Sequence, residues 1–260
     1  MLRLLTTAIV LVLGLGFAAP ARAQMTGNVD RLKADLHGVD LDRAVAAASA
    51  LGSLKDARAR DALLGGLTLG APPKLLTALI EALGLEGDAK ALNLLRHYTE
   101  HRNVKVRAAA LGAVDRLKAK SVPLILIHAL GDSHPMIRAK AARLLGERKE
   151  LRAQRTLFKL LRKGDKSAAE PLGKVGGVEA AKQLAEMIGE IDNRAIARAL
   201  GAMLQRKDFG PDPLRLQVVK TLCKLPGVAA TAALTEYVAS QQTVTISKRI
   251  AERCIGDRQK

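Results

Sequence analysis

The sequence predicts an all-α protein, an α-solenoid (α/α superhelix) of stacked helix pairs. Apolar residues recur at helical spacing along the chain, and no alternating run is long enough to indicate a β-sheet. Helix-like runs that end in Leu-Gly return about every thirty residues, a period typical of repeat architectures. The glycines that mark this period are Gly52, Gly84, Gly146, Gly173 and Gly201. Because one pair of this size cannot bury its apolar face alone, the pairs must stack on one another.

The segment from Asp132 to Lys166 shows the repeat most clearly and has the most one-sided charge. Pro135 suits the first turn of a helix because it has no N–H to leave unpaired, and Gly146 tolerates the conformation that closes a helix. The apolar residues between them fall on one helical face. A second helix after the turn completes the pair, which is the predicted central unit.

The other elements follow the same pattern in order. A short helix at 29–36 would cap the array, and Asp40 is a suitable N-cap for the helix after it. The predicted pairs before and after the central pair are 41–51 with 57–67, 73–83 with 89–98, 104–114 with 122–130, and 167–175 with 178–188. A lone helix at 193–204, a pair at 214–225 with 229–239, and a last helix at 246–255 complete the predicted array. We predict three parts: a signal peptide at 1–23, a linker and cap at 24–40, and a solenoid at 41–260 with a Pro/Gly break near 208–213.

The segment from Met1 to Gln24 has the features of a secretory signal peptide. Arg3 is followed by an uncharged apolar run, and Ala21-x-Ala23 precedes Gln24. An uncleaved anchor helix is the alternative, but the run is slightly short for a bilayer span. We therefore expect cleavage after Ala23 and a periplasmic or secreted protein.

The composition limits the kinds of molecule that the protein is expected to bind. With 48% hydrophobic residues, 2% aromatic residues and no Trp, the core should consist of Leu, Ala and Val, and stacking platforms for bases are nearly absent. The formal net charge is +17, and between Arg102 and Lys166 there are 17 Lys and Arg residues against five acids. A concentrated positive field favours an anionic partner, and its attraction weakens with salt.

The recurrent residues resemble HEAT repeats, including the short HEAT-like kind of the phycobilin lyases. The run that carries the resemblance is Asp132-x-x-Pro135-x-x-Arg138-x-x-Ala141-Ala142-x-x-Leu145-Gly146, which is similar to the first helix of such a repeat. The similarity covers roughly residues 41–256. It implies that the second helices line a concave surface and that an Asp and the Arg six residues later form a ladder between repeats. Only Asp132 and Arg138 keep that pair, because His replaces the Asp before Arg107 and Arg43.

No motif supplies a complete catalytic or metal site. The segment from His97 to His101 has the H-x-x-E-H spacing of a zinc motif. It lies at a helix end, however, it lacks a third ligand, and flanking arginines would repel a cation. We therefore interpret it as a solvated helix end and predict no catalytic residue, no metal ligand and no cofactor.

The two cysteines leave two interpretations open. Cys223 and Cys254 lie about one repeat apart, and an oxidising compartment would permit a disulfide. In the repeat alignment Cys223 matches Gly146 whereas Cys254 matches Leu144, so their side chains should point in different directions. Because a disulfide needs Cα atoms within about 7 Å, this register favours buried free thiols, with the disulfide as the alternative.

The candidate binding surface is the second helix of the central unit. At about 100° per residue, six cations fall within a narrow arc of this helix, and apolar residues, Leu151 and Phe158 among them, cover the opposite side. The six residues, called the predicted ridge, are Arg148, Arg152, Arg155, Lys159, Arg162 and Lys166. A solvated face is the ordinary interpretation, but such faces mix charges, and acids lie at one end only. Arginines also suit bidentate binding of carboxylate or phosphate.

We therefore predict a non-enzymatic, exported scaffold that binds an acidic protein partner through this basic surface. The alternative is a polyanion binder that holds a cell-envelope polymer, an anionic lipid or nucleic-acid phosphates. A third option is an enzyme, either metal-dependent or similar to the HEAT-like lyases. Salt separates the first two, since binding through many phosphates falls steeply as salt rises.

Overall fold

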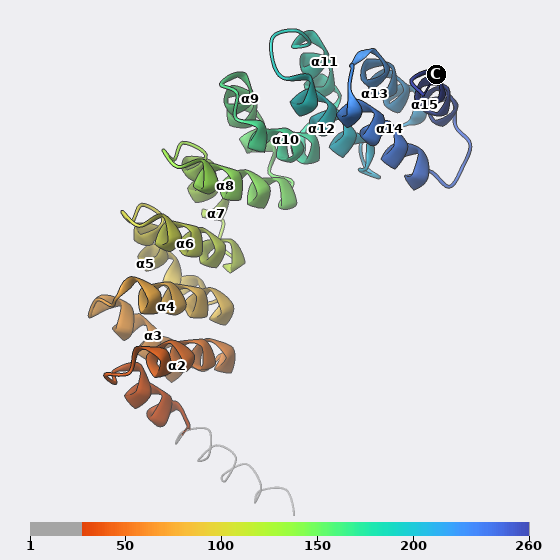
Figure 1. Ribbon diagram of the computed structural model, residues 1–260. Coiled ribbons are helices and arrows are strands. Elements are labelled where there is room, and N and C mark those ends of the chain that lie inside the picture. Colours follow the sequence, from red (N-terminus) through yellow and green to blue (C-terminus); the bar gives the residue numbers. More distant parts are fainter. Residues whose placement is uncertain (1–27, 260) are drawn as a thin grey trace, which may run out of the picture.

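The protein is a curved stack of helices, described here by a computed structural model for residues 28–259 (Figure 1). After a helix at 28–36, the helices are α2 (Leu41–Leu54), α3 (Ala57–Thr68), α4 (Pro73–Glu86), η1 (Ala89–Ala91), α5 (Leu92–Tyr98), α6 (Val104–Arg116), α7 (Val122–Ala129), α8 (Pro135–Glu147), η2 (Leu151–Ala153), α9 (Gln154–Arg162), η3 (Lys166–Ala168), α10 (Ala169–Val175), α11 (Val178–Glu186), α12 (Asn193–Leu204), α13 (Asp212–Lys224), α14 (Val228–Ser240) and α15 (Ile246–Asp257). No strand occurs within 28–259, where one isolated bridge joins Ile188 to Ile191. The prediction of an all-α solenoid is confirmed.

The predicted signal peptide at 1–23 lies outside the described residues, so it stays a prediction. Within 28–259, none of the helices is both long enough and apolar enough to cross a membrane.

Short polar side chains start many of these helices. The Asp40 carboxylate accepts hydrogen bonds from the N–H groups of Asp42 and Arg43, at 2.9 and 3.1 Å, as its predicted role as an N-cap requires. Asp56 caps α3 in the same way, and Asn103 caps α6. These caps satisfy N–H groups that would otherwise lack partners, which is why the helix starts could be located from the sequence.

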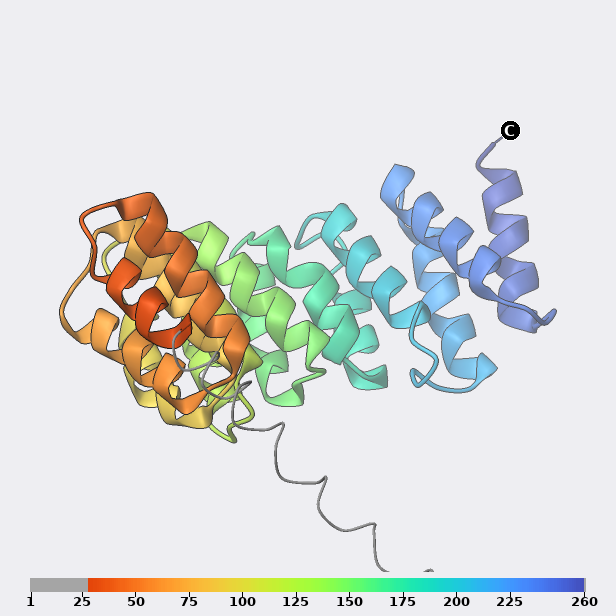
Figure 2. The same cartoon turned by 90° about the horizontal axis from the view of Figure 1, so that it is seen from below.

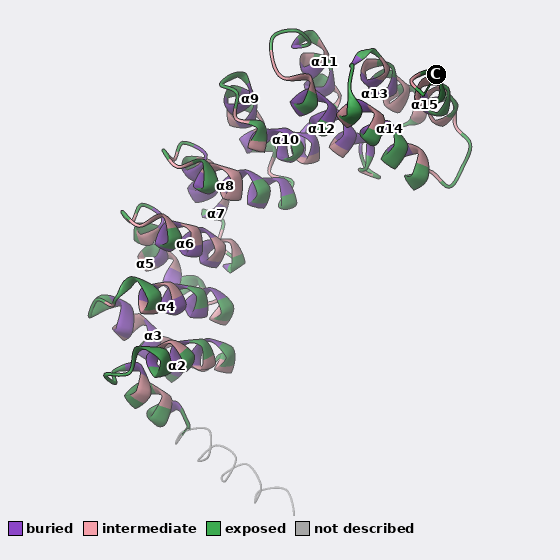
Figure 3. Ribbon diagram, in the orientation of Figure 1, coloured by how far each residue is buried: buried purple, intermediate pink, exposed green. Residues whose placement is uncertain are grey.

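The helices form two layers of different curvature. Figure 1 shows α10, α12 and α14 on the inner side of the arc, and α9, α11 and α13 on its outer side. Direct contacts join α2 to α4, and so on through α6, α8, α10, α12 and α14, so these seven form a continuous inner layer. The view from below shows the same progression from one end of the stack to the other (Figure 2). Buried residues lie where the layers and successive helices meet (Figure 3).

Small residues explain why the inner layer is the concave one. A β-carbon added at Gly84 of α4 would lie 2.5 Å from Cα of Ala113 in α6, and one at Gly52 of α2 would lie 2.7 Å from Cα of Ala82 in α4. Real β-carbons do not come so close, so these glycines let the inner helices approach one another more closely than larger residues would allow. Neighbouring outer helices pack on one another far less than neighbouring inner helices do, so they lie farther apart and the stack curves toward the inner layer.

The pairing of helices differs from the prediction. The sequence placed the helix of the Asp132-x-x-Pro135 motif first in its pair, with α9 as its partner. In the structure α8 packs on α7, the outer helix that precedes it, and α9 packs on α10. A repeat alignment finds the period but not the start of the unit, which is why the prediction was wrong on this point.

Two arginines tie neighbouring units together. Arg107 of α6 donates from Nη2 to Oδ1 of Asp132 at 2.9 Å, and Arg138 of α8 donates from Nε to Oδ2 of Asp165 at 2.6 Å. Each guanidinium also donates to carbonyl oxygens in the turn before its own helix. The Asp that each Arg meets therefore belongs to the following unit. Arg107 forms this contact although His101, rather than an Asp, stands six residues before it. The ladder is therefore not confined to the central unit.

The ladder predicts how stability depends on pH. Burial raises the pKa of the Asp165 carboxyl. Hydrogen bonds from Ser167 and Arg138 together lower it by more than burial raises it, so the pKa of Asp165 lies below its ordinary value. A depressed carboxyl pKa contributes stability that is complete above the unfolded pKa, about 4, and is lost as the pH falls through the folded pKa. Urea unfolding should therefore give nearly constant stability from pH 7 to about 5 and a decline below about 4.

The Asp165→Asn variant is the control for this pH dependence. It should be less stable at pH 7 by about 1–3 kcal/mol, because Arg138 keeps its position without a charged partner. It should also lose less stability than the wild type between pH 5 and 3. An equal decline in both proteins would show that Asp165 does not contribute.

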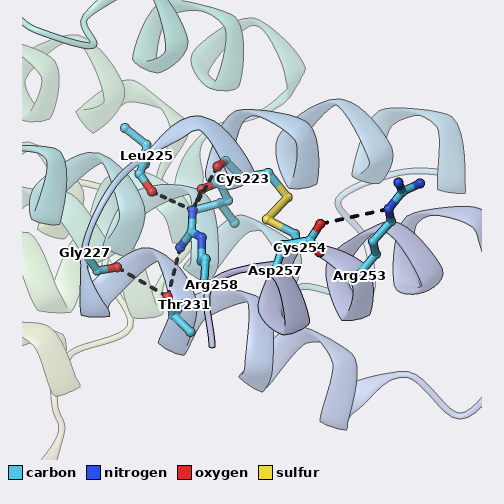
Figure 4. The surroundings of a disulfide bond; sticks show 9 residues. Cys223, Leu225, Gly227, Thr231, Arg253, Cys254, Asp257 and Arg258 are labelled. Atoms are coloured by element: carbon cyan, nitrogen blue, oxygen red, sulfur yellow. Dashed lines mark hydrogen bonds and ion pairs between the residues drawn. A yellow bond between two sulfur atoms is a disulfide. The ribbon is translucent and has the colours of Figure 1, made fainter. Parts of the chain in front are cut away.

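The C-terminal helices are joined by a disulfide between Cys223 of α13 and Cys254 of α15, whose Cα atoms lie 5.9 Å apart (Figure 4). The expectation of free thiols was therefore wrong. It aligned α15 with α8, an inner helix, whereas α15 packs on α13 and α14 and closes the end of the stack. Arg258 reinforces this end, since its Nη2 donates to the carbonyls of Leu222, Cys223 and Leu225 at 2.6–2.9 Å.

Candidate functional site

The predicted ridge is not one helix. α8 ends at Glu147 with Arg148 as its C-cap, and Lys149 has a positive φ of 52° that turns the chain. η2 and α9 then run to Arg162, and Lys166 begins the next short helix, η3. The placement of the six cations at about 100° per residue assumed one uninterrupted helix. Because the segment is divided among separate helices, the six cations do not share one face. Among them, α9 holds Arg155, Lys159 and Arg162, which we call the α9 row.

Acids of the chain pair with the other three cations of the predicted ridge. Arg148 Nε lies 2.5 Å from Oδ1 of Asp115, and Lys166 pairs with Asp192. Arg152 binds Glu150 with two hydrogen bonds, from Nε at 2.7 Å and from Nη2 at 2.9 Å. The hydrogen bond from Arg152 lowers the pKa of the Glu150 carboxyl. A partner would therefore have to displace an acid of the chain at each of these three cations, whereas it would not at the α9 row.

The α9 row is exposed and unpaired. Arg155, Lys159 and Arg162 are exposed, and none of them has an ion-pair partner among residues 28–259. The opposite side of α9 buries Leu157, Phe158, Leu160 and Leu161. The row therefore lies on a helix held firmly by its apolar face.

The position of α9 corrects a further expectation. The resemblance placed this helix in the concave groove, but α9 lies on the outer side of the arc (Figure 1). Leu151, expected on the packed side, is 66% exposed just before α9. The outer surface thus combines three unpaired cations with a nearby apolar side chain.

A second group of cations lies on the inner layer. Arg143 of α8, Lys166 of η3, Lys174 of α10 and Arg198 of α12 line one cavity of about 210 Å³. We call these four residues the inner row. Glu170 is the one acid in the lining. The cavity adjoins a larger groove of about 610 Å³ over α10, α12 and α14, with which it shares Glu170, Lys174 and Arg198.

Sequence reasoning missed the inner row, apart from Lys166, because it searched along one helix. The signal that could have found them is a shared position within the repeat. Arg143, Glu170 and Arg198 each lie three residues before a glycine of the repeat. These three residues are exposed. Aligning the repeats on their glycines, and then comparing across units, would have put them on one surface.

The H-x-x-E-H segment does not form a site among the described residues. α5 ends at Tyr98, so His101 lies beyond the helix, and its Nδ1 accepts a hydrogen bond from the N–H of Asn103 at 3.0 Å. No group of three potential metal ligands occurs within 28–259. His101 thus stabilises the turn before α6, in keeping with the interpretation as a helix end.

The geometry defines the class of protein: an all-α repeat solenoid of stacked helix pairs. Residues 94–170 match the family model for HEAT repeats, so this part of the solenoid is similar to such repeats. No curated protein matches the chain.

Solved structures with similar folds include two enzymes. The complex of CpcE and CpcF of phycocyanin lyase from Nostoc sp. PCC7120 has 20% identity and a TM-score of 0.47, with 88% of this chain and 94% of that chain covered. Human deoxyhypusine hydroxylase in complex with glycerol has 21% identity and a TM-score of 0.34, with 94% and 91% covered. An engineered protein has 16% identity and a TM-score of 0.32, with 88% and 97% covered.

Proposed function

We propose that the protein is a non-enzymatic, exported scaffold that binds an acidic protein partner through the α9 row. The observation that carries this proposal is the row itself: Arg155, Lys159 and Arg162 are exposed on one short, firmly packed helix, and no acid within residues 28–259 pairs with them. Charges arranged in this way attract an oppositely charged surface and orient it during the encounter.

An exposed apolar residue favours a protein over a phosphate polymer. Leu151 is 66% exposed beside the row, and protein interfaces usually combine charged groups with apolar contacts. Polyanion binding, the alternative, needs only the charges. Two features support export: the predicted leader at 1–23, and the disulfide between Cys223 and Cys254, since disulfides persist in oxidising compartments.

Charge reversal of the α9 row tests the proposal. The triple variant Arg155→Glu, Lys159→Glu and Arg162→Glu should reduce capture of the partner from the envelope fraction at least tenfold, because attraction becomes repulsion. The captured protein is then identified, purified and titrated against both forms of the scaffold. It should be acidic, and its affinity should fall less steeply with salt than that of DNA or polyphosphate.

A matched control reverses three exposed cations elsewhere, with Arg58→Glu, Lys90→Glu and Lys105→Glu. This variant has the same net charge as the test variant and should retain capture. Circular dichroism of both variants checks the fold. Undiminished capture by the α9 variant, or equal loss in the control, would contradict the proposal.

A further inference from the structure

The inner row crosses the concave side where three successive inner helices meet. It comes from α8, from η3 with α10, and from α12, so the cations are spread across units rather than along one helix. We propose that the inner row binds an extended acidic segment of a partner protein. This goes beyond the proposed function: the ligand is again acidic, but the site lies on a different face of the solenoid and is independent of the α9 row.

The cavity already holds a carboxylate. Glu170 lies in the lining, with Oε1 2.7 Å from Nζ of Lys174, and Arg143 donates to Glu147 at 2.7 Å on the same surface. The side chains of these pairs are substantially exposed, and such pairs contribute only about 0–1 kcal/mol each. Carboxylates of a ligand can therefore replace them at little cost.

Arg198 offers a position that no acid of the described residues occupies. It lines both the cavity and the adjoining groove, and it forms no ion pair within 28–259. A guanidinium of this kind can bind a carboxylate with two parallel hydrogen bonds. Arg198 is therefore the expected centre of the binding site.

One cation of the inner row, Arg143, acts on a partly buried lysine of the same helix. Lys140 of α8 is half-buried against Gly112 of α6, and desolvation together with the nearby Arg143 and Arg116 lowers the pKa of its ammonium group. Glu81 and Asp115 oppose this shift without cancelling it. Burial is the largest cause of this shift, and a negative charge brought to Arg143 would offset only the part that comes from Arg143.

The dimensions favour an extended chain over a helix. An α-helix with its side chains is about 10–12 Å wide, more than a cavity of this size admits. Small residues of the adjoining groove let a backbone approach closely, and these are Ala197, Gly201, Ala202, Ala229, Ala232 and Ala233. Glu170 and Glu236 also line the groove, so acids of the segment are expected to turn toward its cations and away from these two residues. An extended segment can pass from the cationic cavity onto these small residues.

The spacing of the helices predicts the pattern of acids. Packed helices are about 8–10 Å apart. A polyproline II chain rises about 3.1 Å per residue with three residues per turn, so every third side chain points the same way at about 9 Å intervals. Acids at every third position would therefore meet one inner helix after another.

A synthetic peptide tests this inference. The probe is a fluorescein-labelled peptide of four Asp-Pro-Ala units, titrated with the mature chain and followed by fluorescence anisotropy. The double variant Arg143→Glu and Arg198→Glu should weaken binding at least tenfold. The double variant Arg155→Glu and Lys159→Glu has the same net charge and should change the affinity less than twofold. A peptide of the same composition with its four Asp adjacent should bind at least fivefold more weakly than the probe.

Several results would overturn the inference. Equal losses in the two double variants would show attraction by net charge alone, and equal affinity of the two peptides would remove the spacing argument. Tighter binding of polyphosphate, lost in the same inner-row variant, would assign the site to a phosphate polymer. Failure of the probe to bind would end the inference but would leave capture through the α9 row untouched, because that test uses other residues.

Discussion

Replacing both Cys223 and Cys254 by Ser should lower the free energy of unfolding of the C-terminal helices by about 3–4 kcal/mol. The disulfide closes a loop of sequence separation 31 and joins α13 to α15. In the chain-entropy description, cutting such a loop gives the unfolded chain more freedom and so favours unfolding. Because a solenoid is held together by contacts between neighbouring units, the loss should be concentrated at this end.

Thermal unfolding and amide hydrogen exchange measure this effect. We expect a lower melting temperature, and faster exchange in α13, α14 and α15 than in α4 or α6. Adding a reductant should destabilise the wild type in the same way and leave the double Ser variant unchanged. A thiol titration of the denatured wild type should find no free thiol. Free thiols in that titration, or identical melting of the two proteins, would contradict the disulfide.

The Gly173→Ala variant should be less stable than the wild type by about 1–3 kcal/mol, although Ala favours helices over Gly. A β-carbon at Gly173 of α10 would collide with the carbonyl oxygen of Ala199 and lie 2.6 Å from Cβ of Ala202, both in α12. The contact involves backbone, so relief requires that the two helices move apart. Moving them apart would also open the arc.

Gly65→Ala is the matched control. Gly65 lies inside α3, and a β-carbon there would meet nothing within 4 Å. The same substitution should therefore raise stability by up to about 1 kcal/mol through helix propensity alone. Urea unfolding of both variants gives the comparison, and small-angle scattering should show a larger radius of gyration for Gly173→Ala only. Equal stability of the two variants would refute close packing as the reason for Gly173.

The sequence by itself determined the helices and their stacking. Pro135 and Asp40 mark helix starts through steric limits and local hydrogen bonding, which act within a few residues. Gly146, expected to close its helix, instead lies inside α8 and packs against Pro171 of α10. The period near thirty residues determined that the helices form repeats, since each unit needs a neighbour to bury its apolar face.

Only the tertiary structure decided which surface each helix shows and which charges remain unpaired. Arg148 and Lys166 meet Asp115 and Asp192 of other units, and Arg143 and Arg198 come together from helices far apart in sequence. Cys223 and Cys254 meet because α15 closes the stack instead of continuing the repeat. The physical reason is that such contacts depend on how helices pack in space, and the spacing of residues along one helix does not contain that information.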